Sequence, residues 1–194
     1  MTKVVLPFSM SLDGFVAGPD VGIDEPMGRG GERLHDWLFK SSSGIDAEKA
    51  QEISQRVGAT IIGRRTFDVG IGPWEDTPYP VPSFVLTHEK RQPLAMKSGS
   101  FTFVTDGIER ALSQARAAAG GKDIVVMGAD AARQYVAAGL ADEIVIQLVP
   151  VLMGKGTRLF DQLEDRQIEF TQASAVQSPS VTHLTYRLAK DSGR

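Results

Sequence analysis

Cysteine is absent from the 194-residue sequence, so the chain can form neither disulfides nor thiolate metal sites. Long runs of one charge are also absent, since 21 Lys and Arg residues stand against 24 Asp and Glu residues, for a formal net charge of −3. This balance disfavours nucleic acid and anionic membrane surfaces as partners. No apolar run is long enough to span a bilayer. We therefore expect a cytoplasmic protein that binds no membrane, no nucleic acid and no metal.

The length suits a single domain, residues 1–194, with one hydrophobic core. Short apolar runs of strand length alternate with helical patterns over most of the chain. The last two such segments, residues 168–176 and 181–188, alternate apolar and polar side chains. This alternation predicts an antiparallel pair of strands with one face toward solvent.

The stretch from residue 123 to 150 organises the chain and reads as strand, glycine turn, helix, glycine stop and strand. Gly128 follows the first strand, where the backbone must turn sharply. Asp130 is the predicted N-cap of a helix over residues 131–138, which Gly139 ends. The free N–H groups of that first turn suit a phosphate. An ordinary strand–helix–strand unit explains the pattern as well, because the spacing is not G-x-G-x-x-G.

A second strand–turn–helix pattern follows the buried strand at residues 59–62. Its turn carries Arg64, Arg65 and Thr66, which offer guanidinium groups, a hydroxyl and free backbone N–H groups to a phosphate. A solvated pair of arginines is the alternative. We favour the phosphate interpretation, because the arginines stand directly at the carboxyl end of a buried strand.

Asp13 stands just after the first strand, predicted at residues 3–9. It is either a catalytic or substrate-orienting carboxylate or simply part of an Asp-Gly turn. His88 follows the strand at residues 83–86 and either contacts an adenosine 2′-phosphate or is solvated. Ligands of α/β sheets lie at the carboxyl ends of the strands, which makes both positions candidates.

Three further segments carry structural predictions. HDWLF, residues 35–39, has the spacing of a short helix, with Trp37 packed against the core or a ligand. Asp46 is the predicted cap of a helix over residues 47–57. Residues 69–82 contain four prolines and are predicted to form a loop.

Six segments in chain order carry a resemblance to a known family: SLDGFVAG, GRGGERLHDWLF, IIGRRTFD, FVLTH, VVMGADAARQYVAAGLADE and LVPVLMGKGTRLF. The chain resembles the dihydrofolate reductase superfamily, and within it the stand-alone proteins similar to the reductase domain of the bifunctional riboflavin-biosynthesis enzyme. The resemblance implies an α/β fold with a mixed, mostly parallel central sheet, helices on both faces and antiparallel C-terminal strands. It also implies NADPH as cofactor and a homodimer.

The resemblance also implies roles for individual residues. The implied cofactor contacts are Ser9 and Val16 near the nicotinamide, Gly63, Arg64, Arg65 and Thr66 at the phosphates, Leu86, Thr87 and His88 beside the adenosine 2′-phosphate, and Met127, Gly128, Ala129, Asp130 and Ala131 around the pyrophosphate turn. Asp13 matches a Ser-x-Asp-Gly feature of the riboflavin-type reductases and is the predicted catalytic residue. The predicted substrate-binding residues are His35, Trp37 and Gln147.

Two positions depart from the family pattern. True dihydrofolate reductases hold the pterin with a carboxylate at the start of the first helix, where this chain has His35, with Glu32 and Asp36 close by. The pyrophosphate turn usually has two adjacent glycines, whereas Gly128 is followed here by Ala129, whose methyl group is predicted to intrude on the phosphate. The first departure argues against folate reduction, and the second predicts weaker cofactor binding.

Three functions fit this reading of the sequence. The first is an NADPH-dependent reductase that passes hydride to a C=N or C=O bond of a small heterocycle, such as a pteridine, pyrimidine or flavin-like compound. The second is the riboflavin-pathway reductase that acts on a ribosylated aminopyrimidine phosphate. The third is a nucleotide-binding or ligand-sensing protein without turnover.

Overall fold

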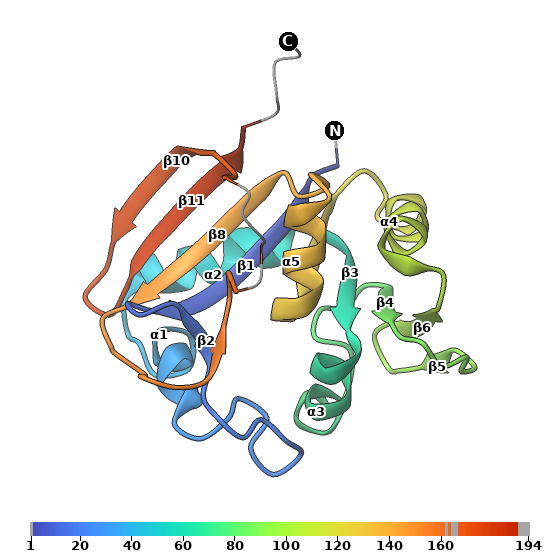
Figure 1. The fold of residues 1–194 in the computed structure, drawn as a ribbon, viewed down its shortest axis with the longest axis horizontal. Coiled ribbons are helices and arrows are strands. Elements are labelled where there is room, and N and C mark those ends of the chain that lie inside the picture. Colours follow the sequence, from blue (N-terminus) through green and yellow to red (C-terminus); the bar gives the residue numbers. More distant parts are fainter. Residues whose placement is uncertain (1, 162, 164–166, 190–194) are drawn as a thin grey trace.

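The computed structural model describes residues 2–161, 163 and 167–189. Their main feature is a nine-stranded sheet of order β10-β11-β8-β1-β7-β3-β4-β6-β5, beside a two-stranded sheet of β2 and β9 (Figure 1). The strands are β1 Val4–Ser11, β2 Phe15–Ala17, β3 Val57–Gly63, β4 Ser83–Leu86, β5 Leu94–Ala95, β6 Ser100–Val104, β7 Asp123–Met127, β8 Glu143–Val149, β9 Thr157–Arg158, β10 Phe170–Gln177 and β11 Thr182–Leu188. The helices are the 3-10 helix η1 Gly31–His35 and the α-helices α1 Asp36–Phe39, α2 Gly44–Arg56, α3 Arg64–Trp74, α4 Gly107–Ala118 and α5 Ala129–Ala137.

The central strands from β8 to β6 run parallel, whereas β10, β11 and the short β5 pair antiparallel with their neighbours. In Figure 1, α5 lies in front of the sheet and α2 lies behind it. Strand β3 is buried along almost its whole length, as expected of a parallel strand covered on both faces. The fold class predicted from the resemblance is confirmed.

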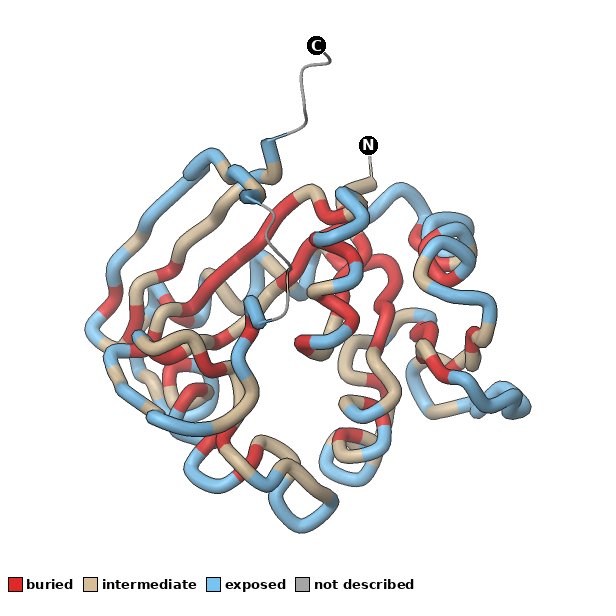
Figure 2. Tube along the Cα trace, viewed as in Figure 1, coloured by how far each residue is buried: buried red, intermediate tan, exposed pale blue. Residues whose placement is uncertain are grey.

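The main core lies between the sheet and the helices α4 and α5. Tyr135 of α5 is fully buried there, and its hydroxyl donates a 2.7 Å hydrogen bond to the carbonyl of Ile108. That bond satisfies the one polar group that the ring brings inside. Figure 2 shows the buried residues concentrated in the central strands, with exposed residues around the periphery.

Helix α3 corrects one prediction from the sequence. Residues 69–74 form its last turns, although the prolines predicted a loop from residue 69. Pro73 lies in the final turn of the helix, where its missing N–H removes the helical hydrogen bond to the carbonyl of Val69 and helps to end the helix at Trp74. Phe67 holds the helix in place through edge-to-face contacts with Phe101 and Phe103, at centroid distances of 5.0 and 5.2 Å.

Both predicted aspartate caps lie one or two residues inside their helices. Helix α2 begins at Gly44, so Asp46 falls in its first turn, and α5 begins at Ala129 with Gly128 as its N-cap. The predicted stop at Gly139 agrees with its left-handed φ of 66°. Asp46 therefore does not cap the helix, and its side chain points into the interior of the protein.

Candidate functional site

The carboxyl ends of β3 and β7 lie side by side, with Ile62 opposite Met127. Each strand leads directly into a helix, through Gly63 into α3 and through Gly128 into α5. Gly128 has a φ of 99°, and a Cβ added to it would lie 2.5 Å from the Thr66 hydroxyl oxygen. A side chain would therefore fill the space between the two turns, which we call the glycine cradle (Gly63, Thr66 and Gly128).

The glycine cradle has the chemistry that a phosphate or pyrophosphate needs. The N-termini of two helices meet there, and the Thr66 hydroxyl adds a hydrogen-bonding group between them. Free N–H groups and the positive ends of helix dipoles favour an anion at such a point. Among the predicted cofactor residues, Gly63, Thr66 and Gly128 are thus brought together, and they fit the phosphates of a dinucleotide.

The methyl group of Ala129, which was predicted to intrude on the phosphate, lies in the main core. The Ala129 side chain is 9% exposed and belongs to the main core, as does that of Ala131. The methyl group therefore packs in the core. Asp130 is exposed and forms an ion pair with Arg133 of the same helix.

The two arginines of α3 have different surroundings. Arg64 holds Asp68 with Nε at 2.8 and 2.7 Å, and its Nη1 donates to Thr87 and Glu89 at 3.1 Å each. The bonds to Asp68 and then Glu89 raise its pKa. Arg65 is exposed, and its Nη2 donates to the carbonyl of Val21 at 3.2 Å. Arg65 thus forms fewer hydrogen bonds within the chain than Arg64 does.

The remaining predicted cofactor residues lie around this edge of the sheet. Thr87 is buried at the end of β4 and His88, next to it, is exposed. Val16 and Leu86 are half-buried against the main core. Ser9 is buried on β1 opposite Gln147 of β8.

Asp13 has a structural role. Its carboxylate accepts hydrogen bonds from the Ser11 hydroxyl at 2.6 Å and from the backbone N–H groups of Met153 and Gly154 at 3.1 and 2.7 Å. These bonds, the Ser11 hydroxyl first, lower its pKa from 3.8 to about 2. Asp13 therefore ties the turn after β1 to the loop after β8. With this pKa the carboxylate is ionised at neutral pH.

The predicted substrate residues Trp37 and Gln147 lie in a buried polar cluster with Ser9, Asp46 and His183. The indole Nε1 of Trp37 donates a 2.8 Å hydrogen bond to the Ser9 hydroxyl oxygen. Its ring meets the imidazole of His183 edge-on at a centroid distance of 5.3 Å. Trp37 thus packs in the core, and its indole N–H is already hydrogen-bonded within the chain.

Asp46 supplies the charge of this cluster. Its Oδ1 lies 2.8 Å from Nε2 of His183, and its Oδ2 accepts a 2.5 Å bond from the Ser41 hydroxyl. Burial raises the pKa of Asp46, but hydrogen bonds from Ser178, Ser41 and His183 outweigh burial and leave the pKa below its ordinary value. The carboxylate is therefore ionised and fully engaged within the chain.

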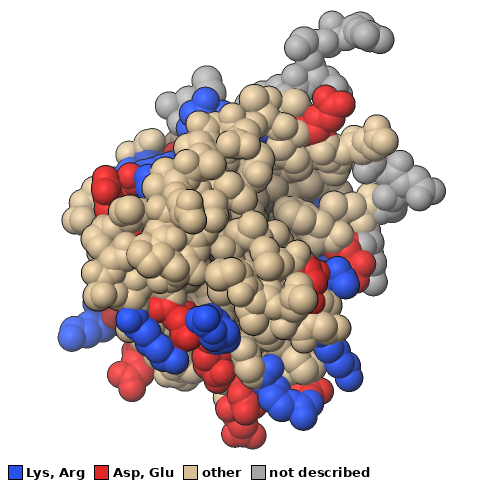
Figure 3. Space-filling model, turned by 90° about the vertical axis from the view of Figure 1, so that its left-hand side faces the viewer, with Lys and Arg blue, Asp and Glu red and all other residues tan. Residues whose placement is uncertain are grey.

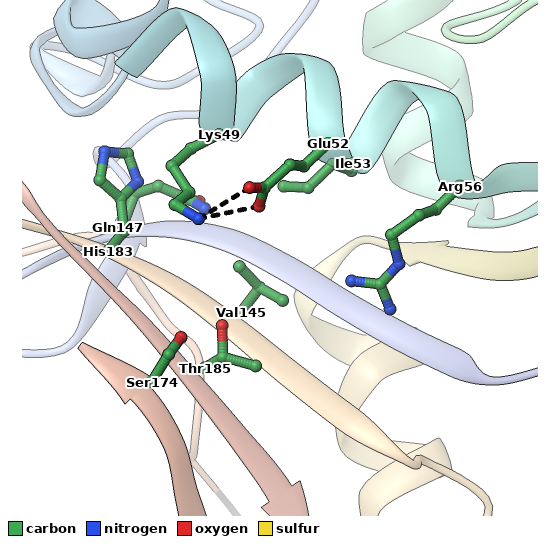
Figure 4. A pocket seen from close by; sticks show the side chains of 9 residues that line it. All are labelled: Lys49, Glu52, Ile53, Arg56, Val145, Gln147, Ser174, His183 and Thr185. Carbon is green, nitrogen blue, oxygen red and sulfur yellow. Dashed lines mark hydrogen bonds and ion pairs between the residues drawn. The ribbon is translucent and has the colours of Figure 1, made fainter. Parts of the chain in front are cut away.

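Gln147 and His183 stand directly opposite each other on β8 and β11. Both are nearly fully buried, and Nε2 of Gln147 and Nδ1 of His183 have no hydrogen-bond partner. Both residues line a small cavity of about 30 Å³ between α2 and the sheet, whose rim carries the ion pair of Lys49 and Glu52 (Figure 4). A cavity of this size with two unpartnered polar atoms suits water or a small polar group.

The two helices before α2, η1 and α1, do not supply a carboxylate to the cluster. His35 ends η1 with its Nδ1 buried and unpartnered, and burial lowers the pKa of its imidazole. Glu32 is exposed, and Asp36 is bonded to Arg33 and Lys40 at 2.9 and 2.8 Å. The buried carboxylate is that of Asp46, which the sequence pattern had assigned to a helix cap.

Asp46 and His183 are the two members of the cluster that sequence reasoning missed. The sequence pattern alone gave no signal of their pairing. Within residues 2–161, 163 and 167–189, no group of three His, Cys, Asp or Glu side chains could hold a metal ion. In the same residues, no helix has the length and apolar character needed to cross a membrane.

Comparison with known proteins agrees with this architecture. The family model described as the RibD C-terminal domain matches residues 2–184. The uncharacterized protein YwjB of Bacillus subtilis (strain 168) is 25% identical over 166 residues, which cover 83% of this chain and 84% of that protein.

Two solved structures have the same fold. A protein from Shewanella sp. PV-4, provisionally named for riboflavin biosynthesis, superposes with a TM-score of 0.76 at 23% identity, covering 97% of this chain and 100% of the other. Dihydrofolate reductase from Enterococcus faecalis superposes with a TM-score of 0.57 at 14% identity, covering 97% of each chain.

Proposed function

Because this chain belongs to the RibD C-terminal domain family, we propose that it is an NADPH-dependent reductase of the dihydrofolate reductase kind. Its substrate is a small heterocycle, a pteridine, pyrimidine or flavin-like compound, with a C=N or C=O bond that accepts hydride. The nicotinamide supplies that hydride when the cofactor is bound, and the protein contributes binding and alignment.

The observation that carries this proposal is the glycine cradle. Two strand–turn–helix units present their helix N-termini to the same point, and Gly128 leaves room there that a Cβ would fill. The cofactor's pyrophosphate fits between Gly63, Thr66 and Gly128. Arg65 is the exposed cation beside it.

The buried polar cluster is the proposed place for the polar edge of the substrate. Ser9 lies near the carboxyl end of β1, which is adjacent to β7, so it shares an edge of the sheet with the cradle. Gln147, opposite Ser9, has an unpartnered amide donor. Such a donor can bind a carbonyl or ring nitrogen of a heterocycle.

Nucleotide binding tests the proposal directly. We expect NADPH to bind, measured by its fluorescence, and to bind more tightly than NADH. Replacing Arg65 by Ala should weaken NADPH binding by about one to two decades if its guanidinium contacts a phosphate. Equal affinity for NADPH and NADH in the unmodified protein would contradict the choice of cofactor.

Gly128→Ala provides a sharper test of the cradle, with Gly139→Ala as its matched control. Both glycines have positive φ, so both alanines strain the backbone, Gly139→Ala by about 1 kcal/mol and Gly128→Ala by more, because φ 99° with ψ 133° is a conformation that almost only glycine adopts. Only Gly128 has a neighbour within the clash distance, and only Gly128 lies in the cradle. NADPH binding should therefore be lost in Gly128→Ala and kept in Gly139→Ala.

The family match also supports the riboflavin-pathway reductase as a second candidate. The two candidates separate in an assay of NADPH oxidation with a panel of heterocycles that includes the ribosylated aminopyrimidine phosphate. NADPH binding without oxidation by any member of the panel would favour a protein that binds the nucleotide without turnover.

A further inference from the structure

The Glu89 carboxylate lies between two guanidinium groups at the end of β4. Its Oε2 accepts hydrogen bonds from Nη1 of Arg64 at 3.1 Å and from Nη2 of Arg91 at 3.2 Å. An oxygen shared by two arginines is the arrangement in which proteins commonly hold a phosphate oxygen. Arg64, and then Arg91, hold the pKa of Glu89 below its ordinary value, so the carboxylate is an anion at neutral pH.

The two arginines are held in place by contacts that do not involve Glu89. Arg64 is fixed by both oxygens of Asp68 and by the Thr87 hydroxyl. The Arg91 guanidinium lies over the ring of Phe103, 5.6 Å from its centroid. The Glu89 side chain is 66% exposed and can swing into solvent. The cationic pair therefore remains when the carboxylate leaves.

This pair also lies beside the proposed cofactor site. Arg64 directly follows Gly63 of the glycine cradle, and Thr87 directly follows β4, the neighbour of β3. A dinucleotide with its pyrophosphate in the cradle that extends toward β4 places one ribose near these side chains. A phosphate on that ribose would meet Arg64 and Arg91, and it would also meet the charge of Glu89.

We infer that Arg64 and Arg91 form an anion site that Glu89 occupies in the free protein, and that Glu89 limits the preference for nucleotides with a phosphate on the adenosine ribose. A ribose phosphate must displace the carboxylate, whereas an unphosphorylated ribose can donate its hydroxyl to it. Glu89 is thus a specificity-determining residue. This inference rests on the proposed nucleotide-binding function.

Calorimetric titration of the full chain with adenosine 2′,5′-bisphosphate and with 5′-AMP tests it, because the two ligands differ only in the ribose phosphate. Glu89→Gln keeps the size of the side chain and removes its charge. We expect this variant to bind the bisphosphate about three- to tenfold more tightly, with 5′-AMP affinity changed less than about twofold. Glu48→Gln, which removes an exposed carboxylate on α2, is the matched control and should change neither affinity.

Adding Arg91→Gln to Glu89→Gln should cancel the gain, which ties the effect to the anion site and not to net charge. Unchanged or weaker bisphosphate binding in Glu89→Gln overturns the inference. If NADPH binds the unmodified protein and Glu89→Gln does not raise its preference over NADH, the inference fails while the proposed function stands. Absence of NADPH binding in both proteins overturns the two together.

Discussion

Asp46 and His183 stand 137 positions apart in the sequence, yet their side chains meet at 2.8 Å in the interior. The carboxylate comes from the first turn of α2 and the imidazole from β11, so the contact joins the helix behind the sheet to an antiparallel strand near its edge. Both residues are nearly fully buried. A buried carboxylate without partners would be costly, so the pair fixes where α2 packs.

Asp46→Ala should destabilise the protein strongly, by about 3 to 5 kcal/mol, because it leaves His183, Ser41 and Ser178 without their common partner. Urea unfolding of Asp46→Ala, His183→Ala and the double variant measures the coupling between the two side chains. The double variant should lose clearly less unfolding free energy than the sum of the losses in the two single variants. Additive losses would mean that the contact contributes nothing of its own. Asp36→Ala, which removes the surface ion pairs with Arg33 and Lys40, should have a much smaller effect.

The second prediction concerns acid stability and Asp13. Folding lowers the pKa of this carboxylate from 3.8 to about 2, so the folded state favours the ionised form. Its contribution to stability is complete above the unfolded pKa and is lost as the pH falls through the folded pKa. Asp13→Asn should therefore unfold more easily than the unmodified protein at neutral pH, with a difference that shrinks between about pH 4 and pH 2.

Unfolding free energies from urea titrations along this pH range provide the measurement. Asp106→Asn, at an exposed position before α4, is the matched control for loss of one carboxylate. A difference between Asp13→Asn and the unmodified protein that stays constant with pH would show that the bonds to Met153 and Gly154 do not depend on the charge.

Local patterns in the sequence predicted the strands and the two glycine turns well. Buried strands are continuous apolar runs, and Gly128 and Gly139 stand where a positive φ is required. The same reasoning failed at the end of α3, where Ile71 and Trp74 pack against the core cluster that contains Phe67, despite the signal from Pro73. Tertiary contacts of that kind leave no trace in a local pattern.

Some residues of the candidate site could likewise be predicted from local sequence patterns, whereas others could not. The sequence predicts that Gly63, Thr66 and Gly128 lie together, because they lie at or just after strand ends, which share one edge of a parallel sheet. Asp46 and His183 were missed because each fits a local role, in a helix turn and in an alternating strand. Only the register that sets His183 opposite Gln147 under the start of α2 joins them.

Strand β10 supports the predicted homodimer, which we propose forms at this edge. It ends the nine-stranded sheet, and residues 171–175 are exposed and carry no charge. Protein edges that stay unpaired are usually protected by charged side chains. Figure 3 shows the face beside β10 and β11, where uncharged residues cover the middle and most charged side chains lie toward the rim. A twofold axis at this edge would pair two such faces.

Light scattering during gel filtration should give twice the 21.0 kDa mass of one chain. Ala175→Lys should shift the mass toward the monomer, because it places a charge in the middle of the proposed interface. Ala117→Lys, at an exposed position on α4, should leave the mass unchanged. A monomer at micromolar concentration in the unmodified protein would refute the homodimer.

The last prediction is that this protein reduces dihydrofolate poorly. Reduction of a pterin is helped by a carboxylate that pairs with its N–H groups and favours the protonated form, a contribution of about 3 to 5 kcal/mol to transition-state binding. Besides Glu52, which Lys49 holds at the rim of the small cavity, three carboxylates lie in this region. Glu32 faces solvent, Asp36 is held by Arg33 and Lys40, and Asp46 is held by His183 and Ser41.

No carboxylate of these three is free for a pterin, so turnover of dihydrofolate with NADPH should lie about two to four decades below that of an enzyme with the free group. Steady-state kinetics decide the matter. A kcat/KM for dihydrofolate of about 10⁴ M⁻¹s⁻¹ or more would show that the prediction is wrong. If Asp46→Asn then abolishes the reaction in a protein that remains folded, His183 gives up the Asp46 carboxylate to the substrate.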